Sequence, residues 1–390
     1  MNEKNMTELS QYNYNEAAGE DRSIQEAIAF LEHADMRTPW EKIEKFSHGK
    51  ELQKLLVEGL LEHDPSQKRE SVARRVRGWM KYTMNQTIKK KDAIELCFIL
   101  GLSVEEADEF VALVSEEGLH WRSPDEIVYI FALKQGMSYQ EAQKLNEEMK
   151  RKLSAVRESR EPAQDSFTPV IRAEVAALRT REELEDYLTE AVPRLGRWHN
   201  NAYKLFMEML EILEHPELDE IERRAEVFEE ERLTARDITR EYFYGDHVLY
   251  AKEQVRAGKK KKEDSGKEKL TFTEIQKNIS SGWPDDVALS KMRNRKMDVT
   301  RKVLILLFLA TDPGSLPEDE EDLEWEPSGE ESFEDLYCRL NDMLLQCGYR
   351  ALDPRSPFDW MILYCIHEGD MMDVSARLRA MIRAMFGEKE

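Results

Sequence analysis

The sequence from Arg122 to Gly136 returns near the C-terminus as the sequence from Arg355 to Gly369, and this repeat constrains the fold more than any other feature. Both stretches open with Arg-Ser-Pro, continue through apolar residues and close on Gly, with Glu126 in the first matched by Asp359 in the second. Ser at the N-cap, Pro at the first helical position and an acid three residues after the cap together signal a helix start with a capping box. The closing Gly supplies the left-handed residue that ends a helix. Each stretch is therefore predicted to form one short buried helix.

The elements around the two stretches repeat as well. A basic helical segment, an all-apolar helix, a further helix, the Arg-Ser-Pro helix and a last helix follow one another twice along the chain. The apolar helices at 93–100 and 303–310 align with Phe98 opposite Phe308. The sequence thus predicts an all-α fold in which two related helical, helix-turn-helix-like units flank a helical insert.

The chain has 390 residues, which is long enough for two or three domains. Polar and charged stretches predict the boundaries between its parts. The expected order is a flexible N-terminus (1–22), a first helical unit (23–157), a linker (158–169), a helical insert (170–257), a basic flexible loop (258–269) and a second helical unit (270–390) with an acidic insertion at 315–335.

Composition narrows the class of protein. Hydrophobic residues at 41%, charged residues at 35%, and only 17 Gly and 13 Pro indicate a helix-rich, soluble chain. The first residues lack the apolar core of a signal peptide, and the longest apolar run, 303–310, is far shorter than the about 20 residues that cross a bilayer. Four cysteines without CxxC spacing indicate reduced, buried thiols. We therefore expect a cytoplasmic protein with no membrane partner.

Two basic segments stand out against the net charge of −22. Between 68 and 91, nine basic residues accompany one acid, which gives a local charge of +8, and between 291 and 302 six basic residues accompany one acid, which gives +5. We predict that these segments contact nucleic-acid phosphates. The candidate residues are Lys68, Arg69, Arg74, Arg75, Arg77, Lys81, Lys89, Lys90, Lys91, Lys291, Arg293, Arg295 and Lys296.

Helical geometry sorts the first basic segment into two faces. At about 100° per residue, a helix over 71–81 places Val72, Val76 and Trp79 on one side. Arg74 and Arg77 then lie on the opposite side, together with Lys81. The apolar stripe is predicted to dock on a core while the basic stripe faces solvent.

The order of elements resembles the XRE-type helix-turn-helix regulators of Gram-positive bacteria. A basic helix is followed by an apolar helix that closes with Gly-Leu-Ser-x-Glu-Glu-Ala (101–107), and a later helix carries Glu-Ala at 141–142, similar to the C-terminal helical extension of one subgroup. The similarity covers roughly 50–150 and, less well, 270–386. It implies a DNA-binding regulator whose recognition-helix residues would be Arg74, Arg77 and Lys81, with Lys291 and Arg293 as counterparts. The Gly-Lys-x-x-Pro turn of that family is absent after the basic helix.

Alternatives remain open at the level of sequence. A basic stripe can also be a solvated face, or a dock for the acidic regions of the chain itself. The eight histidines show no metal-ligand spacing, and the chain contains neither a phosphate-binding Gly-rich loop nor GxSxG, so we predict no enzyme, metal site or cofactor. The expected partner is nucleic acid, with DNA favoured over RNA. The alternative is a helical adaptor that binds a protein partner.

Overall fold

The structure is a computed structural model that describes residues 8–19, 22–36, 51–80, 88–115, 118–153, 168–191, 195–196, 198–215, 233–260, 273–311, 333–366 and 374–387. Within these ranges it contains 19 helices and no strand, so the predicted all-α fold is confirmed there. None of the described helices is long and apolar enough to cross a membrane. Lys81, most of the predicted linker, most of the basic loop and most of the acidic insertion lie outside the described residues.

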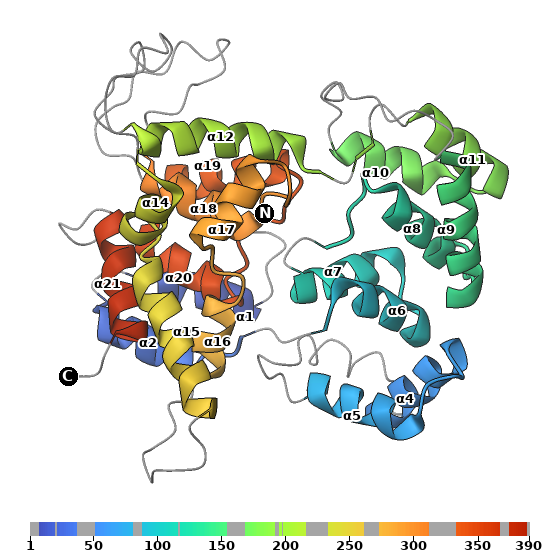
Figure 1. Cartoon of the computed structure of the whole chain (residues 1–390), viewed down its shortest axis with the longest axis horizontal. Helices are drawn as coiled ribbons and strands as arrows, with labels where there is room; N and C mark the ends of the chain where they lie inside the picture. Colours follow the sequence, from blue (N-terminus) through green and yellow to red (C-terminus); the bar gives the residue numbers. More distant parts are fainter. Residues whose placement is uncertain are drawn as a thin grey trace. The chain divides into compact units, whose positions relative to one another are not determined.

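The chain folds into two compact units, each built from packed helices (Figure 1). The middle unit comprises residues 37–200 and 348–350, and the terminal unit comprises 1–36, 201–347 and 351–390. The helices of the middle unit are α4 (Leu52–His63), α5 (Arg69–Met80), α6 (Lys90–Leu100), α7 (Val104–Ser115), α8 (Pro124–Lys134), α9 (Tyr139–Leu153), α10 (Thr168–Ala177) and α11 (Arg181–Glu190). The helices of the terminal unit are α1 (Glu8–Ala17), α2 (Ile24–His33), α12 (Asn200–Glu214), α14 (Ala235–Glu241), α15 (Gly245–Lys260), α16 (Glu274–Ser280), α17 (Asp286–Arg293), α18 (Arg301–Ala310), α19 (Phe333–Gln346), α20 (Pro357–Ile366) and α21 (Val374–Phe386).

One hydrophobic core holds the middle unit together, and all eight of its helices contribute to it. Helix α4 packs on α5 and α6, α8 packs on α9, and both α10 and α11 pack on α8 (Figure 1). Ile171 of α10 and Leu184 and Leu188 of α11 are completely buried in this core. Burying one such side chain is worth about 1.5–3 kcal/mol, so this apolar stripe helps to attach α10 and α11 to the unit.

The helix ends of the middle unit follow local sequence signals. Ser103 and Glu106 form a capping box, with Ser103 N donating to Glu106 Oε2 at 2.8 Å and Glu106 N donating to Ser103 Oγ at 3.2 Å. Ser138 and Glu141 form a second one, at 2.8 and 3.3 Å. Gly136 has a φ of +64°, the left-handed conformation predicted for the residue that ends the Arg-Ser-Pro helix. These predictions are confirmed.

The capping box predicted for the first Arg-Ser-Pro helix is wrong. Helix α8 begins at its Pro, but Ser123 makes no side-chain cap hydrogen bond. The Glu126 carboxylate accepts a hydrogen bond from the backbone N of His120 at 2.6 Å and pairs with Lys90 Nζ at 2.9 Å. A neighbouring helix thus brings a cation to Glu126, and this charge-assisted contact outcompetes the N–H of Ser123.

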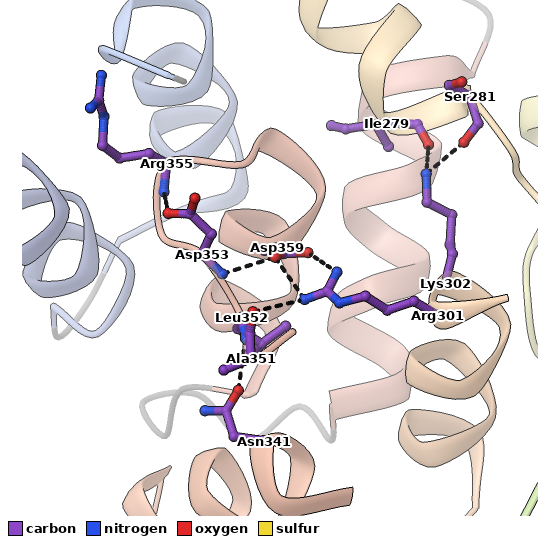
Figure 2. Close-up of polar contacts among 10 residues, drawn as sticks. All are labelled: Ile279, Ser281, Arg301, Lys302, Asn341, Ala351, Leu352, Asp353, Arg355 and Asp359. Atoms are coloured by element: carbon purple, nitrogen blue, oxygen red, sulfur yellow. Dashed lines mark hydrogen bonds and ion pairs between the residues drawn. The ribbon is translucent and has the colours of Figure 1, made fainter. Parts of the chain in front are cut away.

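The loop before the second Arg-Ser-Pro helix has the same hydrogen bonds (Figure 2). Leu352 N donates to Asn341 Oδ1 at 2.7 Å, as Leu119 N donates to Asp108 Oδ1 at 2.7 Å in the middle unit. Asp353 N donates to Asp359 Oδ2 at 2.8 Å, in the place of the bond between His120 and Glu126. Each of these residues of the middle unit is separated from its counterpart in the terminal unit by the same number of positions along the chain. The first residue of the preceding apolar helix also pairs with the acid in both units, Arg301 with Asp359 and Lys90 with Glu126.

The N-terminal helices belong to the terminal unit, which differs from the prediction that residues 1–22 are flexible and that a first unit begins at 23. Helix α1 packs on α20 and α2 packs on α21. The Nε1 of Trp360 donates to the backbone O of Asn13 at 2.8 Å, and Phe30 stacks on the same indole with ring centroids 4.8 Å apart. Since these partners lie at opposite ends of the chain, local sequence patterns carry no signal for them.

The predicted helical insert (170–257) is not one body in the structure. Helices α10 and α11 join the core of the middle unit, whereas α12, α14 and α15 belong to the terminal unit. Helix α15 also continues to Lys260, beyond the residue at which the basic loop was expected to begin. Helical periodicity identified these segments as helices, but it could not show which core each apolar stripe enters.

Candidate nucleic-acid interface

Helix α5 carries the first basic segment, and a short turn after α4 sets where it begins. Ser66 donates to Asp64 Oδ1 through its backbone N at 3.1 Å and its hydroxyl at 2.6 Å, and Gln67 Nε2 donates to Oδ2 at 2.9 Å. The hydrogen bonds from the side chains of Ser66 and Gln67 lower the pKa of Asp64. The carboxylate therefore stays ionised at neutral pH and keeps the turn closed.

The two predicted faces of α5 are observed. Val72, Val76 and Trp79 are 1%, 0% and 4% exposed, and they attach α5 to the core of the middle unit. Arg74 and Arg77 are exposed on the other side of the helix. Both are on the same face because residues three apart on a helix are neighbours.

The remaining cations of this segment differ in how they are used. Lys68 and Arg69 are exposed, and Arg69 lies 3.6 Å from Glu58 of α4. Arg75 is half-buried, with its guanidinium 5.1 Å from the ring centroid of Trp79. Within the described part of the chain, no acidic side chain is paired with Arg74 or Arg77. These two arginines, with Lys68 and Arg69 beside them, form the candidate interface, which we call the α5 basic face.

The three lysines at the start of α6 differ in their exposure to solvent. Lys90 is half-buried and pairs with Glu126 across to α8. Lys89, the N-cap residue of α6, and Lys91 are both exposed. The structure therefore leaves two of these three predicted contacts accessible.

In the second basic segment, two of the predicted arginines contact other side chains of the terminal unit. Arg293 forms a bidentate ion pair with Glu214, which is 2% exposed. The guanidinium of Arg295 lies 3.8 Å from the ring centroid of Tyr203. Lys291, Arg295 and Lys296 are exposed. Of the predicted phosphate contacts in this segment, Arg293 is therefore held by a buried acid of the terminal unit, whereas the other three remain accessible.

A stack of aromatic rings in the middle unit was not identified from the sequence. The ring centroids of His120 and His199 are 4.4 Å apart, and those of His199 and Tyr349 are 4.5 Å apart. Burial lowers the pKa of His120 well below its usual value, and His199 and the charges of Lys90 and Arg122 lower it further. His120 is therefore a neutral, structural histidine at physiological pH.

Among the residues that the structure describes, no group of three or more His, Cys, Asp and Glu side chains is arranged to hold a metal ion. Comparison with known proteins found no matching family model, no similar curated protein and no similar solved structure.

Proposed function

We propose that this protein is a non-enzymatic, nucleic-acid-binding regulator that contacts phosphates through the α5 basic face. The observation that carries this proposal is the exposure of Arg74 and Arg77 opposite a buried apolar stripe, with no acidic partner among the described residues. The resemblance to XRE-type regulators favours DNA over RNA and a bacterial source. Because Cys97, Cys347 and Cys365 are buried free thiols, a reducing compartment such as the cytoplasm suits the chain.

If the protein binds phosphates, the salt dependence of its affinity for DNA can be calculated. Each neutralised phosphate releases counterions, and the slope of log K against log salt is about −0.9 per phosphate for duplex DNA. If the four exposed cations of the α5 basic face each neutralise one phosphate, affinity should fall about 100-fold between about 50 and 200 mM salt. Lys89 and Lys91 would raise this factor toward about 1,000-fold if they also bind phosphates.

The direct experiment compares two double variants with the wild-type chain. Arg74→Glu/Arg77→Glu reverses the α5 basic face, and Arg236→Glu/Arg383→Glu makes the same change in charge at exposed positions of the terminal unit. Binding of a fluorescent DNA duplex, measured by anisotropy, should be lost in the first variant and kept in the second. Equal, weak binding by all three proteins would refute the proposal. A matched RNA duplex tests the preference for DNA.

The ion pair of Arg293 with the buried Glu214, together with the net charge of −22, favours a second candidate function. In this alternative the protein is a helical adaptor that binds another protein and no nucleic acid. The ultraviolet absorbance ratio and mass of the purified protein, before and after a high-salt wash, distinguish the two. Loss of nucleic-acid absorbance on washing supports the regulator, and a protein partner in fixed ratio without that absorbance supports the adaptor.

We also propose that the middle and terminal units are related copies. The support is the shared set of hydrogen bonds around the two Arg-Ser-Pro helices, together with the ion pair that the first residue of α6 and of α18 makes with the acid of the following Arg-Ser-Pro helix.

A further inference from the structure

A cavity of about 960 Å³ lies in the middle unit between α6, α8 and α9. Its lining includes Lys90 and Lys91 at the start of α6 and Asp125 and Glu126 at the start of α8. Residues along α9, from Tyr139 to Arg151, make up most of the rest of the lining. We call this cavity the α9 groove.

The corresponding place in the terminal unit is filled by the short helix α16. Lys302, the second residue of α18, donates from Nζ to the backbone O of Ile279 at 3.0 Å and of Ser281 at 2.6 Å (Figure 2). Gln276 Nε2, near the other end of α16, donates to the backbone O of Met385 in α21 at 2.6 Å. Helix α16 also packs on α20. One helix of two turns thus contacts α18, α20 and α21 together.

The shared ion pairs establish which residues correspond. Lys90 and Arg301 are the first residues of α6 and α18, and each pairs with the acid of the following Arg-Ser-Pro helix. Lys91 therefore occupies the position of Lys302, in a register that differs by one residue from the predicted alignment of Phe98 with Phe308. Lys302 is 1% exposed and satisfied by the carbonyls of α16, whereas Lys91 is exposed and has no partner within the described part of the chain.

A buried polar group in the α9 groove gives a second, independent observation. Asn146 lines the groove and is 4% exposed, and its Oδ1 has no hydrogen-bond partner among the described residues. In α21 the buried residues come in neighbouring pairs, and the second residue of each pair is apolar: Leu378, Ile382 or Phe386. In α9 the second residue of the buried pair that begins with Leu145 is Asn146. The last helix of the middle unit therefore buries a polar residue at a kind of position that is apolar throughout the last helix of the terminal unit. An unsatisfied buried acceptor is destabilising, so the middle unit is less stable when nothing bonds to Asn146 Oδ1. A ligand that brings a hydrogen-bond donor to this oxygen would remove that cost.

We propose that the α9 groove binds a short helix from a partner protein, in the way that α16 fills the corresponding place in the terminal unit. Lys91 receives the last carbonyls of that helix, which have no partner within the helix and lie at the negative end of its dipole. A side-chain donor on the helix, such as the amide of a glutamine, reaches Asn146. The groove shares Lys91 with the predicted nucleic-acid contacts, but none of the residues of the α5 basic face lines it. The variant Arg74→Glu/Arg77→Glu therefore tests nucleic-acid binding without changing the groove.

The sequence of α16 itself provides a probe. A fluorescent peptide of residues 272–283 is added to the full-length protein, and binding is followed by anisotropy, with a peptide of scrambled sequence as the negative control. Loss of a charge-assisted hydrogen bond in Lys91→Met should weaken binding of the α16 peptide roughly 10-fold to 100-fold. Lys54→Met removes one exposed charge from α4, outside the groove, and should leave peptide binding unchanged.

A second variant separates binding from folding. Asn146→Leu removes the unsatisfied acceptor, so it should weaken peptide binding while leaving the middle unit as stable as in the wild type or more stable, as measured by hydrogen exchange. Equal affinity for wild type, Lys91→Met and Asn146→Leu would mean that the peptide binds elsewhere, for instance by displacing α16 in the terminal unit. That result, or no binding of the peptide to the wild type, would overturn the proposal.

Discussion

Replacing Arg301 with methionine removes one half of a buried ion pair while keeping most of the side-chain volume. The side chains of Arg301 and Asp359 are 5% and 4% exposed, and the guanidinium donates to both carboxylate oxygens at 2.8 and 2.9 Å and to the O of Ala351 at 3.2 Å (Figure 2). In Arg301→Met, Asp359 keeps only the hydrogen bond from Asp353 N. Leaving a buried charge without its counter-ion costs about 3–5 kcal/mol, so we expect a loss of that size in the terminal unit.

The middle unit contains the matched control. Lys90 and Glu126 make the equivalent pair at 2.9 Å, but their side chains are 22% and 17% exposed. Water can solvate Glu126 after Lys90→Met, and partly exposed pairs are worth up to about 1 kcal/mol. The same chemical change should therefore cost about 1 kcal/mol in one unit and several times more in the other.

Native-state hydrogen exchange measures the two costs separately, because amides of α20 and of α8 report on their own units. A global unfolding curve would not do so, since a chain with two compact units need not unfold in one step. The double variant Arg301→Met/Asp359→Leu should recover part of the loss but not all of it, because the N–H of Asp353 then loses its acceptor. If Arg301→Met destabilises α20 no more than Lys90→Met destabilises α8, the role assigned to burial is wrong.

Two further predictions concern buried titratable groups. Because burial lowers the pKa of His120, the unfolded chain takes up a proton near pH 6.5 while the folded chain does not, so the unfolding free energy of the middle unit should fall below that pH by at most about 1.4 kcal/mol per pH unit. Hydrogen exchange of α8, measured at about pH 7.5 and 5.5, should show this slope in the wild type and in His33→Gln, a control at an exposed histidine. The slope should be smaller in His120→Phe. Equal slopes in all three proteins would contradict the prediction. Native protein treated with a thiol-alkylating reagent near neutral pH should be modified first at the exposed Cys338, as read by peptide mass spectrometry. Burial raises the pKa of both Cys347 and Cys365 to about 12, so rapid modification of either thiol in the folded chain would contradict this burial.

Part of the candidate interface was predictable because it depends on local geometry. Helical periodicity alone placed Val72 and Val76 on one face of α5 and Arg74 and Arg77 on the other, as the structure has them. The cap at Ser103 was predictable for the same reason, since its partner is three residues away. The accessibility of the second basic segment was not predictable, because the acid that binds Arg293 belongs to a helix far away in sequence.

The sequence by itself determined that the described chain is helical, where many of its helices begin and end, and which faces of those helices are apolar. Those properties follow from contacts between residues three or four positions apart. Only the tertiary structure decided that α1 and α2 complete the terminal unit, that α10 and α11 complete the middle unit, and that Glu126 pairs with Lys90 instead of capping its own helix. An apolar stripe can be buried in either core, and a carboxylate pairs with whichever cation the packing brings near, so these outcomes depend on contacts between residues far apart in the chain.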